Sequence, residues 1–180
     1  MTSKRWGLLL TVALAGCGPY FYKYKAPDST EGMVPISVSF SGDPVVAQAA
    51  YFLEGATCSE LRDLQPNDSP TKSVRVFAPT GQPASFHVVG TTSSSTSLGY
   101  STSTVRLQQC FNDIVTFIPS ANASYRLLYE RNGDQCRVSL QEERSGTRQD
   151  ATAALVRRTK FFGGSSTPSS SFCTDPWPHR

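Results

Sequence analysis

Short stretches in which apolar and polar residues alternate limit the folds open to this chain more than any other feature. Ile36, Val38 and Phe40 alternate with Ser37 and Ser39, which places every second side chain on the same face of an extended backbone. Similar short stretches recur between segments rich in Gly, Pro, Asn and Ser. The pattern is typical of antiparallel sheets with one buried face and predicts a mainly β chain.

The predicted strands are separated by turn signals along most of the chain. We expect strands at 34–40, 47–54, 73–78, 84–90, 104–109, 113–118, 124–131 and 136–142. The alanines of the second stretch also suit a helix. Asn132-Gly133, between the last two stretches, indicates a hairpin, because Asn and Gly accept the positive φ of a tight turn.

Short helices are expected in two places. Thr57 and Glu60 stand at the spacing of a capping box, which predicts a short helix over 59–64, and a second is expected within 149–158. We therefore predict an antiparallel β-sandwich of about seven or eight short strands with one or two short helices. Residues 34–180 would form this sandwich as a single domain.

Two segments stand apart by composition. Residues 91–104 are almost all Ser and Thr, interrupted by Leu98-Gly99-Tyr100, and a long exposed hairpin or a mobile loop both fit them. Leu98 and Tyr100 near the tip are candidate partner contacts, because exposed loops on a rigid scaffold often carry recognition. The Gly-, Ser- and Pro-rich segment 163–171 is expected to be flexible.

The N-terminus has the layout of an export signal. Lys4 and Arg5 precede an apolar run over 6–15, which is too short to span a bilayer. Leu14-Ala15-Gly16-Cys17 then resembles the lipobox of bacterial lipoproteins, in which a diacylglycerol joins the cysteine thiol and a peptidase cuts just before that cysteine. The new amino group is then acylated. The resemblance implies a signal peptide over 1–16 and a lipid on Cys17.

The same resemblance implies a location. Gly18 stands where an Asp tends to retain lipoproteins at the inner membrane, which favours the periplasmic face of the outer membrane. Two or three acyl chains, each contributing about 0.8 kcal/mol per buried CH₂, give a stable anchor. Residues 17–33 would be the lipidated N-terminus and tether. Its Tyr- and Lys-rich part, 20–25, fits either a segment on the membrane interface or an edge strand packed on the domain.

Charge argues against nucleic acid as a partner. Removing 1–16 takes away Lys4 and Arg5 and lowers the formal charge from +3 to +1. Arg144, Arg148, Arg157, Arg158 and Lys160 concentrate positive charge late in the chain. They suit contact with anionic lipid, lipopolysaccharide or peptidoglycan, but a solvated helix face with partners four residues apart is the preferred interpretation.

The predicted domain contains four cysteines: Cys58, Cys110, Cys136 and Cys173. An even number in an exported chain predicts two disulfides, and the absence of C-x₂₋₄-C spacing argues against a metal site. If the three strands between 113 and 142 form one up-down-up meander, Cys110 and Cys136 lie at the same end of a sheet. This predicts the pairs Cys110–Cys136 and Cys58–Cys173. The stretch 110–140 also resembles small disulfide-bonded β-rich outer-membrane lipoproteins, and that resemblance implies no activity.

Residues that would support catalysis are few. His87 is the only histidine within the predicted strands, between Phe86 and Val88, so we expect it to face solvent or the opposite sheet. An ordinary strand residue is the preferred interpretation over a catalytic base or metal ligand. Ser69-Pro70-Thr71-Lys72 matches S-x-x-K, but it lies in a Pro-rich loop without the accompanying motifs. No phosphate-binding or dinucleotide-binding motif is present, so no cofactor is expected.

These features favour a membrane-anchored, periplasmic-facing lipoprotein that acts as a non-catalytic binding or scaffold module of the cell envelope. Its candidate partners are the membrane, through the anchor, and an envelope protein. A periplasmic hydrolase, or an inhibitor of an envelope enzyme, is the alternative. A hydrolase would require His87 or a hidden pair of carboxylates in a pocket.

Overall fold

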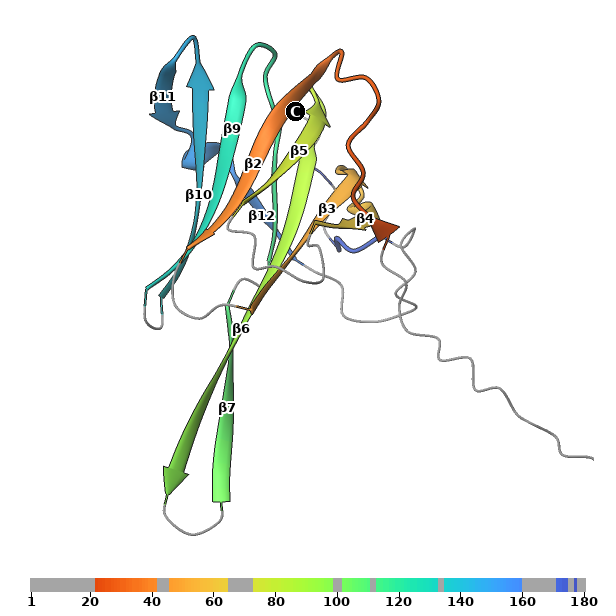
Figure 1. Ribbon diagram of the computed structural model, residues 1–180. Coiled ribbons are helices and arrows are strands. Elements are labelled where there is room, and N and C mark those ends of the chain that lie inside the picture. Colours follow the sequence, from red (N-terminus) through yellow and green to blue (C-terminus); the bar gives the residue numbers. More distant parts are fainter. Residues whose placement is uncertain are drawn as a thin grey trace, which may run out of the picture.

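Two β-sheets dominate the computed structural model (Figure 1). The structure describes residues 22–41, 46–64, 73–98, 102–110, 113–132, 135–159, 171–174 and 177, with 46–48, 89–98 and 102–110 described by their backbone alone. Sheet A runs in the order β1 (Tyr22–Lys23), β4 (Ser59–Asp63), β3 (Val46–Glu54), β6 (Ala84–Leu98), β8 (Ile114–Phe117) and β12 (Val156–Arg158), with β7 (Thr102–Cys110) paired to the distal part of β6. Sheet B runs in the order β11 (Thr147–Asp150), β10 (Gln135–Arg144), β9 (Ser124–Asn132), β2 (Met33–Ser41) and β5 (Ser73–Pro79).

The predicted mainly-β, sandwich-like fold is confirmed. The described residues contain more strands than the seven or eight expected, because β1, β11 and β12 are too short to show alternation. Most strand pairs are antiparallel, but β2 pairs with β9 in parallel, as β1 does with β4. The parallel pair in the middle of sheet B brings the N-terminal β2 beside β9.

The main hydrophobic core lies between the two sheets. Its members alternate along the strands with outward residues, as the sequence predicted. The largest side chains with almost no exposed surface include Tyr51, Tyr129, Phe86, Phe117, Ile36 and Leu127. Ring centroids of Tyr51 and Phe86 lie 5.1 Å apart, and those of Phe117 and Tyr125 also 5.1 Å. Each such side chain contributes about 1.5–3 kcal/mol through burial, so this core is the main source of stability.

A second, smaller hydrophobic cluster covers the outer face of sheet A. Its buried members are Ala50, Phe52, Cys58, Leu61 and Ile114. The C-terminal tail closes over them, with the Phe172 ring 5.6 Å from that of Phe52 and its backbone N–H donating to the Cys58 carbonyl at 3.0 Å. The predicted Cys58–Cys173 disulfide is present and pins this tail to the turn before β4.

Neither predicted segment forms an α-helix. Residues 59–63 form β4, which pairs with β3 on one side and with β1 on the other; a capping-box spacing is a local signal, and this strand pairing overrides it. Within 149–158 the chain ends β11, forms a single 3₁₀ turn at Thr152–Ala154 and continues as β12. The basic residues of this stretch therefore do not share a helix face.

The predicted three-stranded meander is wrong, because its first strand belongs to the other sheet. β8 pairs with β6 and β12 in sheet A, whereas β9 and β10 form a hairpin in sheet B. That hairpin confirms the turn signal, since Asn132 pairs with Gln135, although 133–134 lie outside the described residues. Cys136 is disulfide-bonded. The side chain of Cys110 lies outside the described part, so the pair Cys110–Cys136 stays a prediction.

The N-terminal segment from Tyr22 onward is part of the fold. Tyr22–Lys23 forms an edge strand on β4, and the Tyr24 ring meets the Tyr51 ring edge-on with centroids 5.9 Å apart. The Tyr24 hydroxyl accepts a hydrogen bond from the Phe77 backbone N–H at 2.9 Å. The edge-strand alternative therefore holds for these residues.

Several predictions fall on parts of the chain that are not described. Residues 1–21, with Cys17, lie outside the described ranges, as do the predicted loop at 65–72 and most of 163–171. Among the described residues, no helix has the length and apolar character that crossing a membrane requires.

Candidate functional site

The outward face of sheet B carries a continuous cross-strand row of polar residues. The register aligns Asp150, Gln141, Arg126, Ser37 and Arg75 on neighbouring strands from β11 to β5. Core residues adjoin Gln141, Arg126, Ser37 and Arg75 in the chain, so the strand period of two turns these four side chains outward. Arg75, Arg126 and Asp150 are exposed, while Ser37 and Gln141 are partly buried.

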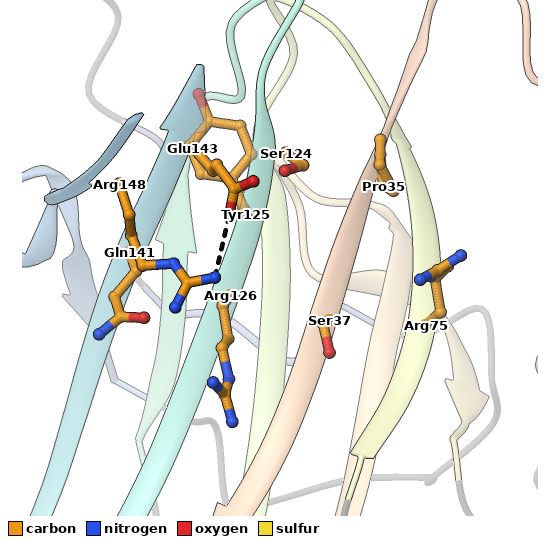
Figure 2. A pocket seen from close by; sticks show the side chains of 9 residues that line it. All are labelled: Pro35, Ser37, Arg75, Ser124, Tyr125, Arg126, Gln141, Glu143 and Arg148. Atoms are coloured by element: carbon orange, nitrogen blue, oxygen red, sulfur yellow. Dashed lines mark hydrogen bonds and ion pairs between the residues drawn. The ribbon is translucent and has the colours of Figure 1, made fainter. Parts of the chain in front are cut away.

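A second row lies beside the first and consists of Arg148, Glu143, Ser124 and Pro35. The two rows together line a shallow depression. Arg148 pairs with Glu143 across β11 and β10, with Nη2 and Oε2 3.0 Å apart. The depression has a volume of about 250 Å³ and reaches from Arg148 over Ser124 and Pro35 to the first row (Figure 2). We call Arg75, Arg126, Arg148, Ser37 and Gln141 the arginine face.

The arginine face has an excess of positive charge. The Arg148 guanidinium is neutralised by Glu143. In the part of the chain that the structure describes, neither Arg75 nor Arg126 forms an ion pair. They stand on β5 and β9 with Ser37 of β2 between them (Figure 2), so about 10 Å separates their backbones at the usual spacing between strands.

The chemistry of these groups favours an anion. A guanidinium presents five N–H donors in a planar fork that matches the oxygens of a carboxylate or phosphate. The Ser37 hydroxyl adds a donor between the two forks. The arrangement can therefore hold two anionic groups, or one extended anionic chain that lies across the strands.

An ionic network centred on the buried Glu142 joins the strands of this part of sheet B. The Glu142 carboxylate accepts hydrogen bonds from the Tyr125 hydroxyl at 2.7 Å, from Arg144 Nε and Nη2 at 2.9 and 2.7 Å, and from Gln149 Nε2 at 2.8 Å. These bonds, with Tyr125 the largest contribution, lower the pKa of Glu142 from 4.5 to about 2. The network ties β9, β10 and β11 together, which fixes Gln141 and Arg148 on the arginine face.

A second depression continues the same face toward the far end of the sheet. It has a volume of about 400 Å³, and Gln141 and Arg148 line both depressions. Glu130 and Asp150 stand beside Arg137 at this end. Charges are mixed here, so the excess of positive charge is concentrated at Arg75 and Arg126.

His87 lies away from these depressions. It is 7% exposed and stands between Ala50 and Ile114 in the outer face of sheet A, next to the cluster that the C-terminal tail covers. The expectation that it faces solvent or the opposite sheet is wrong, because His87 is buried on the outer face of sheet A. Among the described residues, no group of three His, Cys, Asp or Glu side chains is placed to bind a metal ion.

The late arginines do not form one surface. Arg144 pairs with Glu142, and Arg157 pairs with Asp113 on sheet A. Arg158 is buried, donating to the carbonyls of Gly55 at 3.0 Å and Ala56 at 2.8 Å, with the Trp177 ring over its guanidinium. Of the predicted basic group, only Arg148 lines the depression, and Lys160 lies outside the described residues.

Sequence reasoning missed Arg75 and Arg126. Each has an apolar residue on either side, as in Val74-Arg75-Val76 and Tyr125-Arg126-Leu127, so alternation predicted an outward side chain but no binding role. No family model, no curated protein and no solved structure matches this chain. The function is therefore argued from the geometry of the fold and the arginine face.

Proposed function

We propose that this protein is a lipid-anchored, non-catalytic binding module of the cell envelope, and that the arginine face binds an anionic envelope component. The class of ligand is a glycan that carries phosphate or carboxylate groups. Cys17 would hold the protein at the periplasmic face of the outer membrane.

One observation is the strongest support for an anionic ligand. Arg75 and Arg126 are exposed, have no ion-pair partner among the described residues and flank the Ser37 hydroxyl. Of the other described arginines, Arg62, Arg144, Arg148 and Arg157 each have a carboxylate partner, and Arg137 stands beside Glu130 and Asp150. Two neighbouring guanidinium groups without such a partner are free to bind an external anion.

The shape of the depression supports a polymer over a small molecule. It is a shallow hollow on a sheet face, of about 250 Å³, whereas sites for small molecules enclose most of the ligand surface. It also continues into the second depression through Gln141 and Arg148. A chain of sugars lying across the strands would follow this path.

The anchor and the fold support a location close to the membrane. The lipobox-like Leu14-Ala15-Gly16-Cys17 is only a few residues before β1, which is already packed on sheet A. The five peptide units from Cys17 to Tyr22 span at most about 18 Å. Lipid on Cys17 would therefore keep the domain within about that distance of the bilayer.

The arginine face is tested on a polyanion column. Dextran sulfate is the probe, with unmodified dextran as the neutral control, and salt elutes the full-length protein. We expect Arg75→Gln/Arg126→Gln to bind about tenfold more weakly than wild type, a loss of about 1.4 kcal/mol. The matched control, Lys25→Gln/Arg157→Gln, removes the same charge elsewhere and should elute close to wild type. An equal loss in both variants would overturn the assignment of the arginine face.

The anchor has its own test. Cys17→Ala should leave the protein without added acyl mass, and cell fractionation should recover an uncut or soluble form. If the variant keeps both the mass and the membrane association of the wild-type protein, the lipoprotein proposal fails.

A further inference from the structure

A long two-stranded ribbon projects from the sandwich (Figure 1). β6 and β7 pair from Gly90 and Cys110 out to Leu98 and Thr102, so of the two alternatives for this segment the hairpin is the one present. β6 pairs with β3 only as far as Thr91. Among the described residues, the 92–98 edge of β6 and the whole outer edge of β7 have no strand beside them. We call residues 92–98 and 102–109 the ribbon.

The other sheet edges of this chain carry features that block edge-to-edge pairing. β1, β11 and β12 are two, four and three residues long and carry charged residues. β5 contains an exposed Arg75 and ends in Pro79. Short length, charge and proline are the usual means by which proteins protect an edge. These four edges are therefore poor templates for another strand.

The 92–98 edge of β6 lacks that protection. No charged residue lies between His87 and Arg106, and no proline lies between Pro83 and Pro119. An unprotected edge is a ready template for an added strand. A two-stranded ribbon is also only marginally stable in water, and added strands stabilise it.

We propose that residues 92–98 of β6 pair antiparallel with the same residues of a second copy of this chain. The two ribbons then form one four-stranded sheet in the order β7, β6, β6 and β7. The inference stands independently of the arginine face.

Three features of the chain favour a second copy through β6. An antiparallel pair centred on Ser95 sets Ser and Thr opposite Ser and Thr at every position except the two ends, where Thr92 meets Leu98, a favourable pairing without charge repulsion. Pairing through β7 would instead bring the two copies of Arg106 close together, and like charges on paired strands destabilise a sheet. Because each ribbon projects from its own sandwich (Figure 1), antiparallel pairing sets the two sandwiches at opposite ends.

The predicted contact residues at the tip fit this arrangement in part. Leu98 ends the open edge of β6 and would lie opposite Thr92 of the second copy when the pair is centred on Ser95. Tyr100 lies outside the described residues.

The test compares two pairs of lysines on the same ribbon. Ser94→Lys/Thr96→Lys places like charges opposite one another across the proposed pair. Thr102→Lys/Thr104→Lys is the control, since it adds the same charge to β7. Sedimentation equilibrium of the full chain, in a density-matched detergent, should give a dimer for wild type and control. The β6 variant should have a dimer dissociation constant raised at least about tenfold.

A second measurement covers the case in which lysines unfold the ribbon. Under mild oxidation Ser95→Cys should form a covalent dimer, and Ser103→Cys, on β7, should not. A wild-type monomer at tens of micromolar would overturn the proposal, as would equal weakening by both lysine pairs. Capture of a different protein by the ribbon of a monomeric chain would also overturn it.

Discussion

Replacing Glu142 by glutamine should remove the charge on which the ionic network of sheet B depends. The carboxylate accepts four hydrogen bonds, from Tyr125, Gln149 and both nitrogens of the Arg144 fork. Glutamine has nearly the same size, but it is neutral. Its NH₂ group cannot accept the hydrogen bonds that the carboxylate oxygen in the same place accepts. The substitution therefore tests the charge with little change in packing.

The cost follows from the pKa of the carboxyl group. Its pKa falls from 4.5 to about 2 in the folded protein, which corresponds to about 3 kcal/mol at about 1.4 kcal/mol per pKa unit. The Glu142 side chain is only 10% exposed, but that of Arg144 is 50% exposed, and solvent weakens such a pair. We therefore expect Glu142→Gln to lower the free energy of unfolding by about 2 kcal/mol near neutral pH.

The pH dependence separates this effect from a packing defect. A carboxyl group whose pKa is lowered by folding stabilises the protein above its unfolded pKa, near 4.5, and that stabilisation is lost as pH falls through the folded pKa, near 2. Urea unfolding of both proteins at pH 7, 5, 3.5 and 2.5 measures the difference. We expect it to be constant down to about pH 5 and to shrink below that. A difference that stays constant to pH 2.5 would refute the reasoning.

Three further predictions concern the covered face of sheet A. Cys58→Ser/Cys173→Ser should lower stability by about 2–4 kcal/mol, because the bond joins residues 115 apart; an unchanged urea midpoint would contradict this. Gly55→Ala should cost about 1–3 kcal/mol, because a Cβ there would overlap the Pro83 carbonyl, and Gly55→Ser should be no better tolerated. Arg158→Met should cost about 1–3 kcal/mol by removing the donors to Gly55 and Ala56, and thermal melting that matches wild type would show that these bonds contribute nothing.

Alternation predicted the strands that have one buried face. Ile36 and Val38, or Leu127 and Tyr129, repeat at the period of two that the core imposes. It failed where strand pairing sets the structure: β4 contributes only Leu61 to a buried cluster, and a local capping signal predicted a helix there. The order of the strands could not be predicted from the sequence either, because no local sequence signal indicates that β8 and β9 belong to different sheets.

The arginine face depends on contacts between distant parts of the chain. Alternation turns Ser37, Arg75 and Arg126 outward, but only the parallel pairing of β2 with β9 places them in one row. Parallel pairing leaves no short turn between the strands, and hence no local signal. The disulfide Cys58–Cys173 was predicted as the pair left over once Cys110 was assigned to Cys136, although the meander behind that assignment is not present.

The most direct test of the proposed function is photo-cross-linking in living cells. A benzophenone amino acid at Ser37 stands between Arg75 and Arg126, and the same group at Leu53, which is 45% exposed on sheet A, is the control. We expect the Ser37 protein alone to form an adduct, and mass spectrometry of the adduct to find a glycan with phosphate or carboxylate groups. No adduct, a neutral or protein adduct, or the same adduct from Leu53 would contradict the proposal.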